Sequence, residues 1–278
     1  EAILNYKKVL KLKPNYIEIF NNLGSILNKI GKVDEAVSVY NEGLNLNPKF
    51  EPLLINRVQI FFDKNDFELA LKDFDNCNSP VSRSRALPSL YALGRINEIY
   101  ERIEKNLLLD NLDLNIAAFS SFISVNEGKK TAHNFCNNPM DFIYYSNLQN
   151  HSKNSNFFIN EIINELDTVE TEWEPISKST YKGFQSKDLF ELSLERINNL
   201  KLIVLKELDL YYQKFKNETC LYIKKWPSKK KLSSWHVVLK KQGFQSPHIH
   251  PSGWLSGVIY LKVVPPLQKN EGAIEFTL

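Results

Sequence analysis

Residues 245–261 read QSPHIHPSGWLSGVIYL, and this stretch decides how the second half of the chain is interpreted. It contains His248 and His250, two histidines with one residue between them. In an extended strand successive side chains alternate between the two faces, so both imidazoles would point to the same side. Two imidazoles on one side of a strand are suited to binding a divalent metal ion. An apolar run at 255–264 follows directly and predicts a further strand.

Three segments extend this pattern: HIHP at 248–251, WLSGVIYL at 254–261 and GAIEF at 272–276. Together they resemble the iron(II)- and 2-oxoglutarate-dependent oxygenases, in a prolyl-hydroxylase-like branch that is fused to tetratricopeptide repeats. The detailed match covers residues 220–278, and a weaker one covers residues 135–144. The resemblance implies an incomplete double-stranded β-helix, or jelly roll, at 156–278.

The resemblance also implies a site for a metal and a co-substrate. His248 matches the first metal ligand of these oxygenases, and His250 stands where they usually carry Asp or Glu. We expect His248 and His250 to bind Fe(II), although His250 could instead lie beside a site completed by water, or both could only anchor a turn before Pro251. Tyr260 and Ser256 are expected to bind 2-oxoglutarate. Ascorbate is a further cofactor that the resemblance allows, and no separate catalytic side chain is predicted.

The resembled oxygenases also use a distal histidine and an arginine that binds the far carboxylate of 2-oxoglutarate. No histidine follows His250 and no arginine follows Arg196 in this sequence. The segments at 221–276 supply about five strands, fewer than the eight that close a small jelly roll. The chain also begins inside a repeat, at Glu1. We therefore expect a fragment of a longer enzyme, and we expect the fragment to be inactive by itself.

A repeat with a period of 34 residues runs through the first part of the chain. Alanine recurs at 2, 36 and 70, an aromatic residue at 6, 40 and 74, and proline at 14 and 48. This period is typical of tetratricopeptide repeats, whose paired helices stack into a solenoid. The later repeats are degenerate, because Gly43 replaces a usual alanine and Arg57-Val58 replaces Leu-Gly. We predict an α-solenoid at 1–126 whose groove binds a protein or peptide, with Asn21 and Asn22 as candidate contacts.

The rest of the chain changes from helical to strand-like patterns. A linker is expected at 127–155, with His133 and His151 as solvated loop histidines. The apolar patterns predict a helix or strand at 157–166, a strand at 168–174, a long covering helix at 188–216, and strands at 221–226, 232–240, 255–264 and 273–276. The predicted fold class is α+β and multidomain, with an α-solenoid before a partial jelly roll and its covering helix.

Composition excludes several classes of protein. The 35 basic and 32 acidic residues give a net charge of +3, which is too small to indicate nucleic-acid binding. The three cysteines are widely spaced and form neither a disulfide framework nor a zinc motif, which favours a reducing, cytoplasmic compartment. No apolar run is long enough to span a bilayer, and no signal peptide is visible, so no membrane partner is expected.

The function predicted for the intact protein is a 2-oxoglutarate- and Fe(II)-dependent dioxygenase that hydroxylates a protein or peptide recruited by the repeats. One alternative is a cupin, since Gly243, His248 and His250 have nearly the cupin spacing, but Trp254 and Leu255 stand where a cupin needs glutamate. Another is a non-catalytic repeat scaffold with a degenerate barrel. A sugar transferase joined to similar repeats is a further alternative, although no nucleotide-sugar motif is visible.

Overall fold

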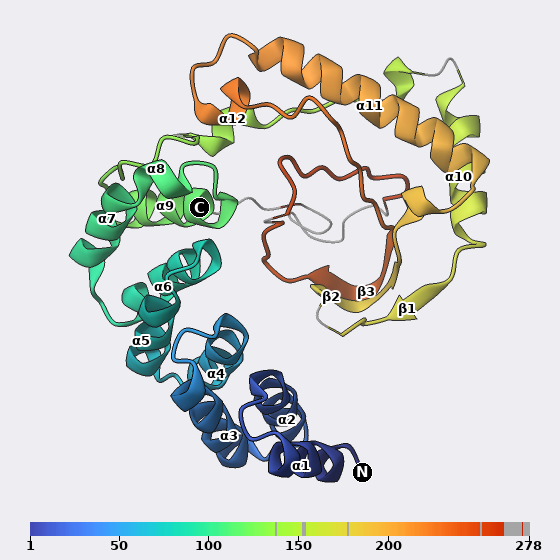
Figure 1. The fold of residues 1–278 in the computed structure, drawn as a ribbon. Coiled ribbons are helices and arrows are strands. Elements are labelled where there is room, and N and C mark those ends of the chain that lie inside the picture. Colours follow the sequence, from blue (N-terminus) through green and yellow to red (C-terminus); the bar gives the residue numbers. More distant parts are fainter. Residues whose placement is uncertain (137, 152–153, 177, 251, 264–273, 275–278) are drawn as a thin grey trace. The chain divides into compact units, whose positions relative to one another are not determined.

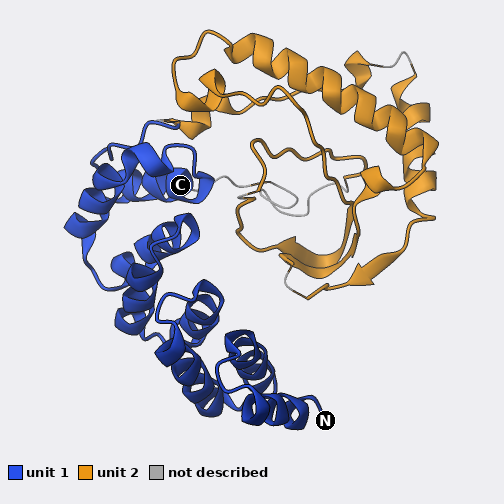
Figure 2. Cartoon of the chain, in the orientation of Figure 1, with its two compact units in different colours: residues 1–135 blue, residues 136–278 orange. Residues whose placement is uncertain are grey.

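The computed structural model describes all residues except 137, 152–153, 177, 251, 264–273 and 275–278. The chain forms two compact units, residues 1–135 and residues 136–278 (Figure 2). The domain limits at 126 and 155 stay a prediction. None of the helices in the described part of the chain is both long and apolar enough to cross a membrane.

Unit 1 is a series of short helices that pack in antiparallel succession (Figure 1). Its helices are α1 (Ala2–Leu12), α2 (Ile17–Lys29), α3 (Val33–Leu46), α4 (Glu51–Asp63), α5 (Phe67–Cys77), α6 (Pro80–Ala92), α7 (Ile96–Lys105), α8 (Leu107–Asp110) and α9 (Leu114–Asn126). The predicted helical solenoid is thereby confirmed.

The repeated positions of unit 1 form its core. Ala36 and Ala70 are fully buried, and Tyr40 and Phe74, one turn later in the same helices, are 1% and 2% exposed. Gly43 needs its lack of a side chain, because a Cβ there would lie 2.6 Å from Leu53 Cδ1. The 34-residue period therefore corresponds to one pair of helices whose small residues allow close approach.

Buried ion pairs join the degenerate repeats. Arg57 and Val58 stand where the earlier repeat has Leu-Gly. Arg57 donates to both carboxylate oxygens of Asp73 at 2.8 and 2.5 Å. Arg83 makes the same two-pronged contact with Asp110, at 2.8 and 2.5 Å. Such paired hydrogen bonds fix the geometry of the two groups as well as their charge. Charged side chains thus join α4 to α5 and α6 to α8.

Unit 2 contains helices and one small sheet (Figure 1). Its elements are η1 (Pro139–Phe142), η2 (Leu148–Asn150), α10 (Ser155–Leu166), β1 (Thr171–Trp173), β2 (Thr180–Ser186), η3 (Leu189–Glu191), α11 (Glu195–Phe215), α12 (Leu221–Lys224) and β3 (Val237–Gln245). The three strands form an antiparallel sheet in the order β1-β2-β3, with an irregular register near Gly183. Helix α11 packs mainly against α10 and η3 around the buried Ile162 and Ile197.

The sequence predictions for unit 2 have mixed outcomes. The strand predicted at 168–174 is present as Thr171–Trp173, and the helix predicted at 188–216 is present as Glu195–Phe215. Residues 157–166 are helical. The strand predicted at 221–226 is wrong, because Leu221–Lys224 form a helical turn with Tyr222 and Ile223 buried. The strand at 232–240 begins only at Val237, and the described residues of 255–264 form no strand. The strand predicted at 273–276 lies outside the described residues except for Ile274.

The two histidines predicted to be solvated are both enclosed. His133 is 6% exposed, and its Nε2 lies 3.2 Å from the carbonyl oxygen of Asp110 in unit 1. The side chain of His151 is 5% exposed, and its Nε2 contacts the Glu207 carboxylate on α11. The prediction failed because a polar loop composition does not show which distant acceptor a histidine will meet.

Candidate metal centre

The two histidines follow the last strand of the sheet. Strand β3 ends at Gln245, which pairs with Thr180 of β2, and the next amide, of Ser246, donates to the Ser179 carbonyl at 2.8 Å. These contacts fix the point at which residues 246–250 leave the sheet. The histidine segment itself has no regular secondary structure, so the predicted strand at His248 and His250 is wrong.

The two imidazoles nevertheless lie side by side. The ring centroids of His248 and His250 are 4.8 Å apart, with the ring planes inclined by 40°. Nδ1 of His248 lies 2.7 Å from the carbonyl oxygen of Ser246. Nδ1 of His250 lies 2.7 Å from Oγ of Ser256. A loop therefore brings together the two rings that the sequence analysis expected from an alternating strand.

The partners of these rings determine which nitrogen is available. A carbonyl oxygen only accepts hydrogen bonds, so Nδ1 of His248 is the donor, and in the neutral form of this ring the lone pair is on Nε2. Among the described residues, no hydrogen bond involves Nε2 of either ring. Burial lowers the pKa of His250, and the neighbouring His248 lowers it further. Both effects favour the neutral imidazole, which is the form that binds metals.

The distance between the two rings can be compared with that between two imidazoles that share one metal ion. Two imidazoles bound to one metal through nitrogens at about 2.1 Å, at an angle of about 90–110°, have centroids about 4.5–5.3 Å apart. The observed 4.8 Å lies within this range. Within the described ranges, no group of three or more His, Cys, Asp and Glu side chains converges on a possible metal position. The described part of the site thus brings two imidazole rings together.

The two residues expected at the co-substrate are placed differently. Ser256 is exposed and its hydroxyl meets His250. Tyr260 is 51% exposed, and no hydrogen bond or ring contact between described residues joins it to either histidine. The structure therefore brings together His248, His250 and Ser256, while Tyr260 lies apart from these contacts.

Two tryptophans also support the histidine segment. The ring of Trp235 meets that of His250 edge to face at 5.4 Å. Trp254 donates from Nε1 to the carbonyl oxygen of Tyr222 at 3.1 Å and stacks on the Tyr222 ring. The sequence alone predicted no specific contact for either tryptophan. Their order in the chain carries no signal of these partners, because the contacts are 15 and more residues apart.

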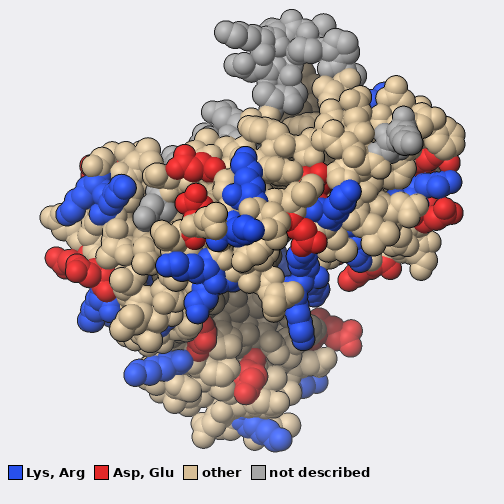
Figure 3. All heavy atoms as spheres, turned by 90° about the horizontal axis from the view of Figure 1, so that it is seen from above, with Lys and Arg blue, Asp and Glu red and all other residues tan. Residues whose placement is uncertain are grey.

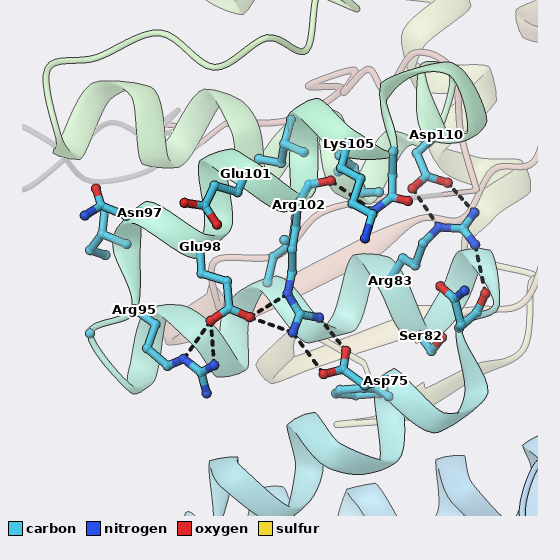
Figure 4. A pocket seen from close by; sticks show the side chains of 18 residues that line it. Asp75, Ser82, Arg83, Arg95, Asn97, Glu98, Glu101, Arg102, Lys105 and Asp110 are labelled. Carbon is cyan, nitrogen blue, oxygen red and sulfur yellow. Dashed lines mark hydrogen bonds and ion pairs between the residues drawn. The ribbon is translucent and has the colours of Figure 1, made fainter.

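A separate pocket of about 780 Å³ lies in unit 1 (Figure 4). Its wall carries the Arg83–Asp110 pair and Arg102, which bonds both Asp75 and Glu98. These charged groups bond one another across the wall, so the pocket has balanced charge. On the face shown in Figure 3, basic and acidic side chains are likewise interspersed.

Family comparisons match separate parts of the chain. Residues 1–31 match the family described as "TPR repeat", and residues 17–50 match "Tetratricopeptide repeat". Residues 233–276 match the family described as "Putative 2OG-Fe(II) oxygenase". Tetratricopeptide matches thus lie at the start of the chain, and the oxygenase match lies near its end. The oxygenase segment, residues 233–276, contains both histidines of the pair.

The chain also resembles parts of longer proteins. It is 34% identical over 76 residues to "UDP-N-acetylglucosamine--peptide N-acetylglucosaminyltransferase" of Giardia intestinalis, covering 27% of this chain and 5% of that protein. It is 25% identical over 111 residues to "Tetratricopeptide repeat protein 13" of Homo sapiens, covering 38% and 13%. The chain thus spans a small part of these curated relatives. The solved structure "MamA RS-1 ArsTM double mutant" is 16% identical, covers 45% of this chain and 74% of that one, and has a TM-score of 0.39.

Proposed function

We propose that the chain is part of a 2-oxoglutarate- and Fe(II)-dependent dioxygenase that hydroxylates a protein or peptide. The observation that supports this most is the adjacent pair His248 and His250 inside the oxygenase segment, where no hydrogen bond between described residues involves either Nε2. A pair of imidazoles is a large part of the ligand set used by non-haem iron oxygenases.

The side chains of the oxygenase segment have distinct tasks in this proposal. His248 and His250 hold the iron through Nε2, with the Ser246 carbonyl keeping the proton of His248 on Nδ1. When bound, the iron with 2-oxoglutarate supplies the oxidation that inserts oxygen into a C–H bond of the substrate. Tyr260, whose ring is half exposed, offers its hydroxyl to a carboxylate of 2-oxoglutarate.

The repeats supply the substrate in this proposal. Tetratricopeptide solenoids bind peptide segments in the groove between their helices. Asn21 on α2 accepts from Asn56 on α4 at 2.8 Å, so polar side chains of successive repeats line up. Asn22 is exposed beside them. A peptide with main-chain and polar groups is the partner that these amides suit, and a cytoplasmic location is part of the same proposal.

The test is succinate release from 2-oxoglutarate by the intact protein with Fe(II) and a candidate peptide. His248→Ala is expected to reduce release to the background level, because it removes one of the two nitrogen donors. Ser252→Ala, an exposed serine of the same loop, is the matched control and is expected to keep wild-type release. Equal release by the wild type and His248→Ala would remove the pair from the active site and leave a repeat adaptor as the better description.

A further inference from the structure

The hydroxyl of Ser256 is hydrogen-bonded to His250, and this contact indicates a role other than binding the co-substrate. Its Oγ lies 2.7 Å from Nδ1 of His250, six residues earlier in the chain. We infer that Ser256 is a positioning residue that orients the His250 imidazole toward the metal ion. This inference rests on the proposed function, since it concerns the same metal site.

A turn brings the two side chains together. The amide of Gly253 donates to the carbonyl oxygen of His250 at 3.0 Å, which folds the chain back after the histidine pair. Trp254 then fixes the returning segment by its hydrogen bond to the Tyr222 carbonyl. Ser256, two residues later, reaches Nδ1 of His250. The position of the hydroxyl is therefore set by contacts on both sides of the turn.

The ring of His250 has three neighbours that restrict its rotation. The ring of His248 lies at 4.8 Å and that of Trp235 at 5.4 Å, so apolar and aromatic contacts limit tilting. Ser256 alone among the described residues makes a hydrogen bond to the ring. Contacts between rings restrict the orientation of the imidazole plane, but only a hydrogen bond distinguishes the two ring nitrogens. Ser256 thus determines which nitrogen faces away from the hydroxyl.

The chemistry of a hydroxyl suits both the empty and the metal-bound site. A serine hydroxyl can donate a hydrogen bond as well as accept one, unlike the carbonyl oxygen beside His248. It can donate to Nδ1 when that atom is unprotonated, and it accepts from Nδ1–H when Nε2 binds a metal. Partners of this kind orient metal-binding histidines, and their removal commonly weakens metal affinity about 10–100-fold.

The test is a calorimetric titration of the whole chain with Co²⁺, a divalent ion stable in air, in the absence of 2-oxoglutarate. Wild type is expected to bind, and His248→Ala to lose most of the affinity. Ser256→Ala is expected to weaken Co²⁺ binding about 10–100-fold. Ser256→Thr keeps the hydroxyl and is expected to restore binding to near the wild-type affinity. Ser252→Ala, an exposed serine of the same loop, is expected to bind as wild type does.

The outcomes separate this inference from the function on which it rests. Absence of Co²⁺ binding by the wild type, or binding that His248→Ala leaves unchanged, would overturn both. Binding that requires His248 but has the same affinity in Ser256→Ala would overturn the positioning role alone. Equal weakening by Ser256→Ala and Ser256→Thr would also overturn it, because the hydroxyl would then be irrelevant. Far-UV circular dichroism of each variant shows that the comparison is made between folded chains.

Discussion

At the scale of single residues, the surroundings of each histidine determine its behaviour. His248 and His250 are exposed or half-exposed, and no hydrogen bond between described residues involves their Nε2 atoms. His133 and His151 are instead enclosed with polar partners. The short spacing of the first pair predicted their proximity, because two residues cannot separate far. The partners of the second pair lie 23 and 56 residues away, and no local pattern in the sequence indicates such contacts.

The enclosed His133 predicts how the stability of unit 1 depends on pH. Burial lowers the pKa of His133, and its hydrogen bond with the Asp110 carbonyl opposes this only in part. An unfolded chain binds a proton at this residue near pH 6.5, while the folded chain does not. The free energy of unfolding therefore decreases as pH falls from about 7 through 6.5 toward the folded-state pKa.

His133→Gln is expected to reduce the decrease in the free energy of unfolding between pH 7 and pH 5.5, because a glutamine side chain binds no proton in this range. Urea unfolding followed by circular dichroism at both pH values measures the difference. His248→Gln, at an exposed histidine of unit 2, is the control and is expected to keep the wild-type pH dependence of unit 1. The same loss of stability in wild type and His133→Gln would contradict the explanation.

At the scale of elements, prediction succeeded where a pattern repeats locally and failed where distant pairing decides. The 34-residue period predicted helices in unit 1 because α3 and α5 bury the recurring alanine and aromatic positions. The run Leu221–Ile223 is too short for its period to distinguish strand from helix. Strand β2 was missed because Gly183 and polar residues weaken its pattern, and its pairing with β1 and β3 is non-local.

The buried pair of Arg83 and Asp110 predicts a large effect on helix packing. Their side chains are 15% and 4% exposed. Arg83→Met leaves the Asp110 carboxylate buried without its partner, and it is expected to destabilise unit 1 by about 3–5 kcal/mol. Chemical denaturation measures the change.

The ion pair of Lys64 with Asp34 provides the matched comparison. Its side chains are 50% and 94% exposed, and the contact measures 2.9 Å. Lys64→Met is expected to leave the free energy of unfolding nearly unchanged, because water screens this pair. Similar effects of Arg83→Met and Lys64→Met would show that burial does not determine the importance of these contacts.

At the scale of the whole molecule, two units with separate cores carry the two parts of the proposed function. The buried residues of unit 1 form clusters among α2 to α9, and those of unit 2 include a cluster among α10, η3 and α11. The fusion of repeats with an oxygenase segment could be predicted from motifs, because both motifs are short and local. The number and pairing of strands could not, since they depend on contacts between distant segments.

Separate cores predict separate unfolding transitions. All four tryptophans, Trp173, Trp226, Trp235 and Trp254, lie in unit 2, so tryptophan fluorescence reports that unit alone. Circular dichroism at 222 nm reports the helices of both units. We expect two transitions by circular dichroism, only one of which coincides with the change in fluorescence.

Variants in each core assign these transitions. Ile162→Ala removes a fully buried side chain of unit 2. It is expected to lower the free energy of unfolding measured by fluorescence by about 2–5 kcal/mol and to leave the other transition unchanged. Arg83→Met is expected to lower only the free energy of unfolding of unit 1, whose transition is seen by circular dichroism and not by fluorescence. A single transition that both variants shift equally would contradict the independence of the two cores.

The central claim is that His248 and His250 bind one metal ion together. X-ray absorption spectroscopy of the Fe(II)-loaded chain, prepared without oxygen, tests this most directly because imidazole ligands give a characteristic multiple-scattering signal. We expect the signal of two imidazoles in the wild type and of one in His248→Ala. A wild-type spectrum without imidazole scattering, or one that His248→Ala leaves unchanged, would contradict the claim.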